Sequence, residues 1–332
     1  MSVVPGSVVL LSSSDVDRLL DLPACITAVE AAFRSRGSGV DQPGGVLGVH
    51  LEHGGYHVKA ASLGRDSRYF AAKLNANYPT NSRAGLPTIQ GLVLLSDAVT
   101  GTPLAVMESG TLTRLRTAAT SAVAARHLAN HGAATLAVIG CGAQAQPHIE
   151  AFSAVRPLER VTLFDDRTEV ATTLARRLGD AHPFPVVVST TLDSACTGAS
   201  MIVTCTTARD PFLHAGMLAP GTFIAAVGAD APDKQEVDAN LLAASALVTD
   251  ETMQCAQIGE LHHAIESGAM KTAQVRAELG AVVAGQRPGR LDAEEIVIFD
   301  STGIPIEDVA AAGIIYERAV DTGIGGRFAF RH

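Results

Sequence analysis

Two glycines stand at the spacing that a dinucleotide-binding loop requires. Residues 134–145 read ATLAVIGCGAQA, so a G-x-G-x-x-A pattern directly follows an apolar run and opens an expected helix. Gly140 permits the tight turn, Gly142 lets the backbone approach a pyrophosphate, and Ala145 lets the helix pack close to the strand. The amides at the start of that helix would face the phosphate charge. The pattern predicts a dinucleotide-binding βαβ unit over residues 133–166; its alternative is a set of ordinary turn glycines in another α/β fold.

A carboxylate at the end of the next apolar run indicates which dinucleotide is bound. The run VTLFD ends in Asp165, about 20 residues after the glycines, where an acid bonds the ribose hydroxyls of NAD. Arg167 is the competing signal, because an arginine just past the acid can bind the 2′-phosphate of NADP. We therefore expect NAD, with NADP as the alternative.

Cations gather in the β-rich first third of the chain. In residues 69–77, YFAAKLNAN, Lys73 alternates with two asparagines, so one face of a strand carries a lysine and two amides. On the neighbouring expected strand, Lys59 and His57 lie on one face in the same way. A lone strand lysine is usually a solvated or edge-protecting residue. Arg116 lies near the start of an expected helix, where a cation gains nothing from the helix dipole. Its position therefore indicates that Arg116 and the lysines form a functional cationic pocket.

One acid lies where open α/β sheets place their ligands. Asp230, in the segment VGADAP, comes just past the carboxyl end of an expected parallel strand, at the edge where such folds bind ligands. An aspartate shortly before a proline is also a common turn residue. The residues alone leave these two interpretations of Asp230 equally weighted.

Several chemistries have no support in the sequence. The pair His262-His263 has no third ligand at a useful spacing, so we expect packing or surface residues and no metal. The five cysteines are scattered and never form C-x-x-C, which gives neither a zinc site nor a disulfide framework. No serine has the G-x-S-x-G context of a nucleophile elbow.

The bulk composition points to a globular protein with a small-molecule ligand. The chain has 332 residues, 47% of them hydrophobic and 18% charged, which fits two domains with ample apolar surface to bury. The net charge of −9 and the lack of any Lys/Arg run argue against binding to nucleic acid or to a membrane surface. No segment approaches the roughly 20 apolar residues of a membrane span, and no signal peptide is readable. We expect a cytoplasmic location.

The elements that must position these residues fall into two groups. Helices are expected around 16–20 and 26–34, followed by an antiparallel sheet over 44–95, a further strand and an Ala-rich helix over 111–129. Beyond Gly132, apolar runs alternate with helical segments, which is typical of a doubly wound parallel sheet covered on both faces. A final helix over 306–322 is expected to pack back onto the first domain. The fold class is α/β, a Rossmann-type sheet plus an α+β domain.

The sequence resembles the ornithine cyclodeaminase/μ-crystallin family over nearly its whole length. Several blocks in the right order carry the resemblance and are specific to the family. They are Lys73-Leu-Asn, Gly85-Leu-Pro-Thr-Ile-Gln90-Gly, Leu104-Ala-Val-Met-Glu, Arg116-Thr-Ala-Ala, Ile139-Gly-Cys-Gly-Ala-Gln144, Gly228-Ala-Asp230, Glu278-Leu-Gly and Phe299-Asp-Ser301-Thr-Gly.

The resemblance implies an architecture and an activity. It implies a homodimer whose N-terminal sheets pair, with residues 1–118 and 304–332 as substrate-binding and dimerisation domain and 119–303 as the NAD-binding Rossmann domain. It also implies hydride exchange between nicotinamide and the carbon–nitrogen bond of a small α-amino or α-imino acid, as in a ketimine reductase or an amino-acid dehydrogenase.

The resemblance also assigns roles to individual residues. Lys73 and Arg116 would hold the substrate carboxylate, with Lys73 also counted as catalytic, and Asp230 would be the acid/base near the substrate nitrogen. The positions that the resemblance implies to line the cofactor are Thr88, Gln90, Thr117, Cys141, Ala143, Gln144, Thr206, Thr207, Val227 and Ser301. Cofactor contacts are also expected from Gly140, Gly142, Asp165, Arg167 and Arg116.

Two departures from the family pattern bear on the substrate. Many members carry a carboxylate-binding arginine after Gln-Pro, whereas this chain reads Gln42-Pro43-Gly44-Gly45. We hypothesise that Lys59 replaces it with a looser, single-point contact. The stretch Gly55-Tyr-His-Val-Lys59 also lacks the glutamate that assists ring closure in the cyclodeaminase, which favours simple hydride transfer. The alternatives are an ammonia-releasing cyclodeaminase that uses NAD catalytically, and a non-catalytic protein that binds a nucleotide and a small ligand.

Overall fold

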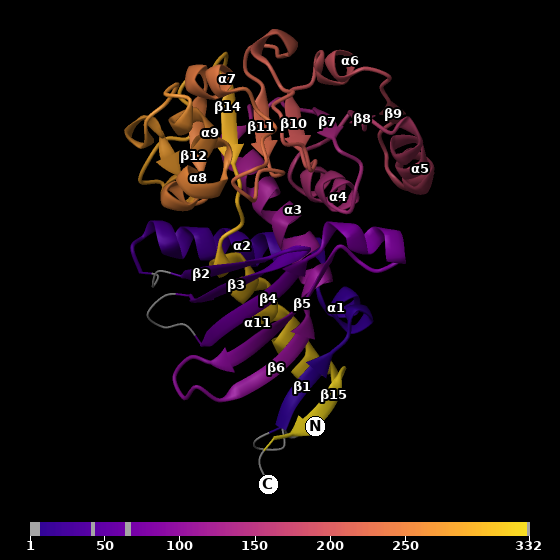
Figure 1. Ribbon diagram of the computed structural model, residues 1–332, viewed down its shortest axis with the longest axis vertical. Helices are drawn as coiled ribbons and strands as arrows, with labels where there is room; N and C mark the ends of the chain where they lie inside the picture. The colour runs from indigo at the N-terminus through magenta and orange to yellow at the C-terminus, as the bar shows by residue number, and fades with distance from the viewer. Residues whose placement is uncertain (1–6, 41–43, 64–67, 331–332) are drawn as a thin grey trace. The chain divides into compact units, whose positions relative to one another are not determined.

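The computed structural model describes residues 7–40, 44–63 and 68–330, and it divides into two compact units (Figure 1). Unit 1 comprises residues 1–117 and 304–332, and unit 2 comprises residues 118–303. The chain passes between them inside helix α3 (Ser109–Leu128), so that Arg116 and Thr117 belong to unit 1.

Unit 1 is built on a mixed seven-stranded sheet in the order β15-β1-β6-β5-β4-β3-β2. Strands β2 to β6 are antiparallel neighbours, as expected for this part of the chain, but β1 runs parallel to β6. The edge strand β15 was missed by the sequence interpretation. The strands are β1 (Ser7–Leu11), β2 (Gly45–Leu51), β3 (Gly54–Ser62), β4 (Tyr69–Asn77), β5 (Ile89–Asp97), β6 (Pro103–Glu108) and β15 (Gly326–Ala329).

Helix α11 (Pro305–Thr322) lies on one face of this sheet, against β3, β4 and β5, and also packs on helix α2 (Leu22–Gly37) (Figure 1). Its first turn is buried, including the two acids Glu307 and Asp308. Proline at the start suits a first turn, whose N–H groups have no helical partner. The remaining helices of unit 1 are α1 (Ser13–Leu19), which begins at Ser12 with a capping box, and the short 3₁₀ segment η1 (Pro79–Ala84).

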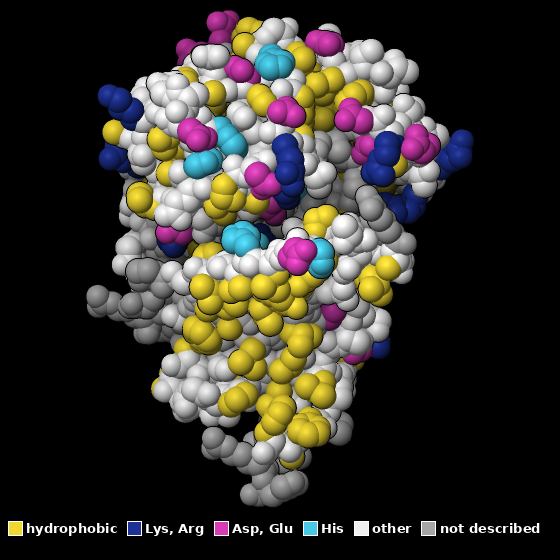
Figure 2. All heavy atoms as spheres, viewed as in Figure 1, with side chains coloured by type: hydrophobic (Ala, Val, Ile, Leu, Met, Phe, Trp, Pro, Cys, Tyr) yellow, Lys and Arg dark blue, Asp and Glu magenta, His cyan; other side chains and the backbone are white. Residues whose placement is uncertain are grey.

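The opposite face of the sheet is apolar and exposed. Leu74 and Leu92 are directly paired on β4 and β5, and they are 44% and 55% exposed. The same face carries exposed side chains from the outer strands, including Leu47 and Leu10. Figure 2 shows them as a broad hydrophobic patch over the strands of unit 1. A monomeric protein rarely exposes so continuous an apolar surface.

Unit 2 is a doubly wound sheet of eight parallel strands, in the order β13-β12-β14-β11-β10-β7-β8-β9, which confirms the fold predicted from the sequence. Only the two-residue edge strand β13 was missed. The strands are β7 (Thr135–Ile139), β8 (Arg160–Phe164), β9 (Val186–Val188), β10 (Met201–Thr204), β11 (Phe223–Ala226), β12 (Ala246–Thr249), β13 (Ala277–Glu278) and β14 (Val297–Asp300).

Helices and short 3₁₀ turns connect these strands (Figure 1). They are α4 (Ala145–Val155), α5 (Thr168–Leu178), η2 (Gly179–Ala181), α6 (Leu192–Cys196), η3 (Ala215–Met217), α7 (Ala239–Ala244), α8 (Thr252–Ile258), α9 (Glu260–Glu266), η4 (Thr272–Gln274) and α10 (Leu279–Val283). Within the described ranges, every helix is too short or too polar to cross a membrane.

The strand order fixes where unit 2 can bind a ligand. The chain proceeds from β7 to β8 and β9 in one direction, and then returns to the other side of β7 with β10. In open α/β sheets the ligand crevice lies at such a reversal, at the carboxyl ends of the strands. The segments that follow β7 and β10 begin at Gly140 and Cys205, so this edge carries the glycine loop.

Candidate functional site

The glycine loop has the tight geometry that its sequence predicted. Gly140 has a φ of +93°, a conformation that glycine adopts far more readily than other residues. A Cβ atom there would lie 2.9 Å from the carbonyl oxygen of Cys205 and from Cγ2 of Thr206. Gly140 therefore lets the loops after β7 and β10 approach each other closely. At Gly142, by contrast, nothing lies within 4 Å of the position of a Cβ atom, so the loop is open there.

Asp165 is held against this loop by two backbone amides. Its Oδ2 accepts a hydrogen bond from the amide of Cys141 at 2.9 Å, and its Oδ1 accepts one from the amide of Arg167 at 3.0 Å. The guanidinium of Arg167 lies 3.7 Å from Oδ1, but that side chain is 71% exposed. The carboxylate is thus fixed at the end of β8, beside the glycine loop, where a ribose-binding acid is expected.

A cavity of about 660 Å³ opens at this edge of unit 2. Six of the residues predicted to bind the cofactor line it, namely Gly140, Gly142, Asp165, Arg167, Thr206 and Thr207. Cys141, Ala143, Gln144, Val227 and Ser301 are not among its lining residues. The Oε1 atom of Gln144, at the start of α4, is buried without a hydrogen-bond partner in the described part of the chain. The open glycine and the fixed acid fit a dinucleotide.

Lys73 lies on the face of the unit 1 sheet that α11 covers. Its ammonium group is 2.7 Å from Oδ1 of Asp308, and the two side chains are 3% and 2% exposed. Burial and the nearby Arg116 guanidinium lower the pKa of Lys73 to about 7, while the Asp308 carboxylate opposes that shift. The pKa of Asp308 is below its usual value because the Lys73 and Arg116 cations outweigh its burial.

Arg116 completes this buried cluster. Its Nη1 lies 2.6 Å from Oε2 of Glu307, and its Nε lies 3.1 Å from Oδ1 of Asp308. Glu307 also accepts a hydrogen bond from the backbone of Ile304 at 3.0 Å, which ties the cluster to the start of α11. Neither acid was predicted as a site residue, because this segment was predicted only as a helix that packs back onto the first domain. Acids in the first turn of that helix were the available signal.

Lys59 lies directly opposite Lys73 in the β3–β4 register. Directly paired residues of antiparallel strands project to the same face, so both lysines lie on the α11 side of the sheet. Lys59 is half-buried, and its charge also lowers the pKa of Lys73. Of the four residues where the arginine is missing, Gln42 and Pro43 lie outside the described residues, while Gly45 pairs with Ala60 next to Lys59.

Asp230 lies in the loop after β11, as predicted. Its carboxylate is 48% exposed and lies 2.6 Å from the ammonium of Lys234, four residues later in the same loop. Its amide donates to the carbonyl of Gly228 at 3.0 Å. A half-exposed carboxylate at the carboxyl edge of the sheet is available to exchange a proton with a ligand.

The other predicted cofactor residues occupy several places. Within unit 1, Thr88 precedes β5, Gln90 is exposed on that strand, and the Thr117 hydroxyl donates to the backbone of its own helix at 2.8 Å. Within unit 2, Val227 and Ser301 directly follow β11 and β14, and the Ser301 amide donates to Ala226 at 3.0 Å.

The prediction that His262 and His263 lack a third potential ligand was wrong. Glu266 lies one turn further along α9, and one ligand atom from each of the three residues lies within 4.8 Å of the others. The periodicity of an α-helix brings positions 262 and 266 onto one face, which the sequence interpretation overlooked. One nitrogen of His263 is already hydrogen-bonded to the carbonyl of Lys234 at 2.8 Å.

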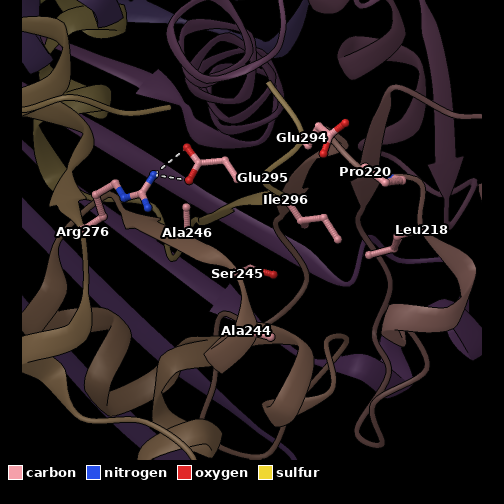
Figure 3. Close-up of a pocket in the computed structure, with 9 residues that line it drawn as sticks. All are labelled: Leu218, Pro220, Ala244, Ser245, Ala246, Arg276, Glu294, Glu295 and Ile296. Carbon is pink, nitrogen blue, oxygen red and sulfur yellow. Dashed lines mark hydrogen bonds and ion pairs between the residues drawn. The ribbon is translucent and has the colours of Figure 1, made fainter. Parts of the chain in front are cut away.

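A second cavity, of about 410 Å³, lies at the opposite edge of unit 2, where β12 begins and β14 is about to begin (Figure 3). Arg276 points at Glu295 there, with Nη1 at 2.6 and 2.7 Å from the two carboxylate oxygens (Figure 3). The guanidinium of Arg276 is therefore paired with the Glu295 carboxylate, which also lines this cavity. It contains none of the residues predicted to bind cofactor or substrate.

The chain belongs to the ornithine cyclodeaminase/mu-crystallin family, because the sequence model of that family matches residues 7–323. It is similar to an archaeal alanine dehydrogenase, a dimer solved with bound NAD, at 34% identity and a TM-score of 0.94, covering 98% of this chain and 100% of the other.

Two further solved structures are similar. One is the Δ(1)-pyrroline-2-carboxylate reductase of Thermococcus litoralis with NADH and L-proline, at 30% identity and a TM-score of 0.91, covering 96% and 99% of the two chains. The other is the iminosuccinate reductase of Paracoccus denitrificans with NAD⁺, at 33% identity and a TM-score of 0.87, covering 97% and 99%.

Proposed function

We propose that this chain is an NAD(H)-dependent oxidoreductase that acts on the carbon–nitrogen bond of a small α-amino or α-imino acid. The observation that carries the proposal is the cavity of about 660 Å³ at the strand reversal of unit 2, lined by Gly140, Gly142 and Asp165. The three similar enzymes, solved with NAD, NADH or NAD⁺, act on compounds of this class and support it.

Unit 2 would hold the cofactor through its glycine loop and Asp165. The carboxylate of Asp165 favours NAD, because it would bond the ribose hydroxyls and repel a 2′-phosphate. Arg167 keeps NADP as the alternative, since its exposed guanidinium stands beside that acid. When bound, the nicotinamide ring supplies or accepts the hydride at the substrate α-carbon.

Unit 1 would bind the substrate carboxylate through Lys59, Lys73 and Arg116. Asp308 and Glu307 already hold Lys73 and Arg116 in fixed positions, so their orientation costs little when the substrate binds. The proposed domain roles are therefore substrate binding for residues 1–118 with 304–332 and cofactor binding for residues 119–303.

Asp230 would exchange the proton that the reaction requires at nitrogen. In the direction of reduction, the imine nitrogen gains a proton as the α-carbon gains a hydride, which yields the amine. In the direction of oxidation, the same carboxylate takes a proton from the amine nitrogen as the α-carbon gives up the hydride, which yields the imine. Lys234 holds this carboxylate in place by the 2.6 Å ion pair.

The exposed apolar face of unit 1 would be the dimer interface. Its occupant would be the same face of a second copy, which agrees with the dimer seen for the related alanine dehydrogenase. We also propose a cytoplasmic location, because all five cysteines are free thiols, as is usual in a reducing compartment.

A substrate screen tests the proposed function. Purified protein is incubated with cyclic imino acids or with keto acids plus ammonia, each with NADH and with NADPH, and oxidation of the cofactor is followed. We expect oxidation of NADH with at least one imino or keto acid, and slower oxidation of NADPH. Binding of NADH without turnover of any substrate would instead favour the non-catalytic alternative.

A further inference from the structure

Glu236 is a buried acid in unit 2 to which the sequence interpretation gave no role. Its residue is 0% exposed, and it lies six positions after Asp230 in a segment, Lys-Gln-Glu-Val-Asp, that looks like a solvated loop. Among the described residues no lysine or arginine forms an ion pair with it. A buried carboxylate without a cation needs hydrogen-bond donors to compensate its desolvation.

Donors from three residues converge on this carboxylate. Oε1 accepts a hydrogen bond from the amide of Thr206 at 2.7 Å. Oε2 accepts one from the amide of Gly228 at 2.7 Å and one from the hydroxyl of Thr204 at 2.6 Å. Thr204 ends β10 and Gly228 follows β11, so the single carboxylate ties together two neighbouring loops at the carboxyl edge of the sheet.

The backbone of Glu236 is also held by hydrogen bonds. Glu260, also buried, accepts hydrogen bonds from the amides of Glu236 and Val237 at 2.9 and 3.1 Å. The carbonyl of Glu236 accepts from the amides of Phe212 and Leu213, both at 3.0 Å. The backbone of Glu236 is thus fixed on both sides, and its side chain has little freedom to move away from the two loops.

Both loops carry residues of the proposed site. Thr206 lines the cofactor cavity, and its Cγ2 lies 2.9 Å from the position that a Cβ atom on Gly140 would take. The carbonyl of Gly228 accepts the amide of Asp230 at 3.0 Å. A Cβ atom on Gly228 would lie 2.3 Å from the Glu236 carboxyl carbon, so glycine is needed for this close approach.

We propose that Glu236 is a positioning residue, which fixes the loops after β10 and β11 so that Thr206 and Asp230 are correctly placed for the cofactor and for proton exchange. This inference rests on the proposed function, because it assigns the purpose of the fixed loops to NAD(H) binding. Glu236 itself does not line the cofactor cavity.

Replacing Glu236 by the isosteric glutamine tests the proposal. A glutamine has one acceptor oxygen and one NH₂ group, so in either orientation one of the two backbone amides faces a donor. We expect Glu236→Gln to bind NADH about ten- to hundredfold more weakly, because a buried amide loses its acceptor. Gly228→Ala, which displaces the carboxylate instead of changing it, should weaken binding in the same direction.

Amide hydrogen exchange provides a readout that needs no cofactor. In Glu236→Gln the amides of Thr206 and Gly228 should exchange faster than in the unmodified protein. Glu295→Gln is the matched control, because Glu295 is a partly buried acid that accepts backbone and arginine donors at the opposite edge of the same sheet. It should leave both the NADH affinity and these two amides unchanged.

The outcomes separate the two claims. If both Glu236→Gln and Gly228→Ala bind NADH within about twofold of the unmodified protein, or if the two amides keep their exchange rates, the positioning role is wrong. If the unmodified protein itself fails to bind NADH, the proposed function is wrong, and the exchange rates still decide whether Glu236 fixes the loops.

Discussion

The ammonium of Lys73 lies 2.7 Å from the carboxylate of Asp308, although 235 positions separate the two residues in the sequence. A strand in the first third of the chain and a helix near its end thus share one buried ion pair. The pair connects the substrate-binding role proposed for unit 1 with a helix for which no functional role was predicted from the sequence.

Replacement of Asp308 should shift the titration of Lys73. The pKa of Lys73 is about 7, mainly because of burial and Arg116, and the Asp308 carboxylate holds it from falling further. In Asp308→Asn the pKa should fall, so the loss of substrate affinity with rising pH should begin at lower pH. The pH profile of kcat/KM measures this shift. Asp321→Asn, an exposed acid on the same helix, is the control; a profile unchanged in Asp308→Asn would contradict the prediction.

The same pair predicts how stability depends on pH. The pKa of Lys73 falls from 10.5 when unfolded to about 7 when folded, so between these values the unfolded chain binds more protons. The contribution of this group to the free energy of unfolding therefore rises with pH in that window, by up to about 1.4 kcal/mol per pH unit. Lys73→Met should show a flatter dependence in chemical denaturation. An equal slope in both proteins would mean that Lys73 does not titrate there.

Replacement of Lys59 should weaken substrate binding. If Lys59 supplies the charge of the missing arginine, Lys59→Ala should raise KM about tenfold, since a charge-assisted hydrogen bond is lost, and should change kcat little. Lys59→Arg should restore most of the affinity. Lys271→Ala removes an equal charge from an exposed position of unit 2 and serves as control. An unchanged KM in Lys59→Ala would rule out the replacement hypothesis.

Replacement of Asp230 should stop the chemistry and leave cofactor binding intact. An asparagine cannot exchange the proton, so Asp230→Asn should lower kcat about 100- to 10,000-fold, while NADH affinity stays within about twofold. Asp233→Asn is the matched control, because Asp233 is an exposed acid in the same loop, paired with Arg209 at 3.0 Å. Full turnover by Asp230→Asn would show that another group supplies the proton.

A charge on the exposed face of unit 1 should break the proposed dimer. Leu92 is 55% exposed in the middle of the apolar face. An arginine there would lose its hydration in the proposed interface, which costs free energy of association. We expect Leu92→Arg to sediment as a monomer at concentrations where the unmodified protein is a dimer. Val99→Arg, at an 85% exposed position in a turn, should remain dimeric. A dimeric Leu92→Arg would place the interface elsewhere.

Local features of the site could be predicted from the sequence. The glycine loop and Asp165 follow directly from two apolar runs, because the backbone geometry of a βαβ unit places them together whatever the rest of the chain does. The alternation of side chains along a strand likewise places Lys73 with Asn75 on one face of β4, and Lys59 with His57 on one face of β3. The direct pairing of Lys59 with Lys73 depends on the register between the two strands, which was not predicted from the sequence.

The buried acids could not be predicted in the same way. Glu236, Glu307 and Asp308 look like solvated loop or helix-start residues, because their burial depends on partners far away in the sequence. Strand β13 has only two residues, too few for any periodic signal, and β15 forms only by pairing with β1 at the other end of the chain. These acids are buried, and these strands form, through contacts between residues far apart in the sequence. The local sequence pattern does not predict such contacts.

The ratio of NADH consumed to ammonia released tests the central claim most directly. With a cyclic imino acid as substrate, the proposed oxidoreductase should consume one equivalent of NADH for each amino acid formed and release no ammonia. With ornithine and NAD, any ammonia that it releases should be matched by an equal amount of NADH formed. Release of ammonia from ornithine with no net change in NADH would identify a cyclodeaminase and contradict the proposed function.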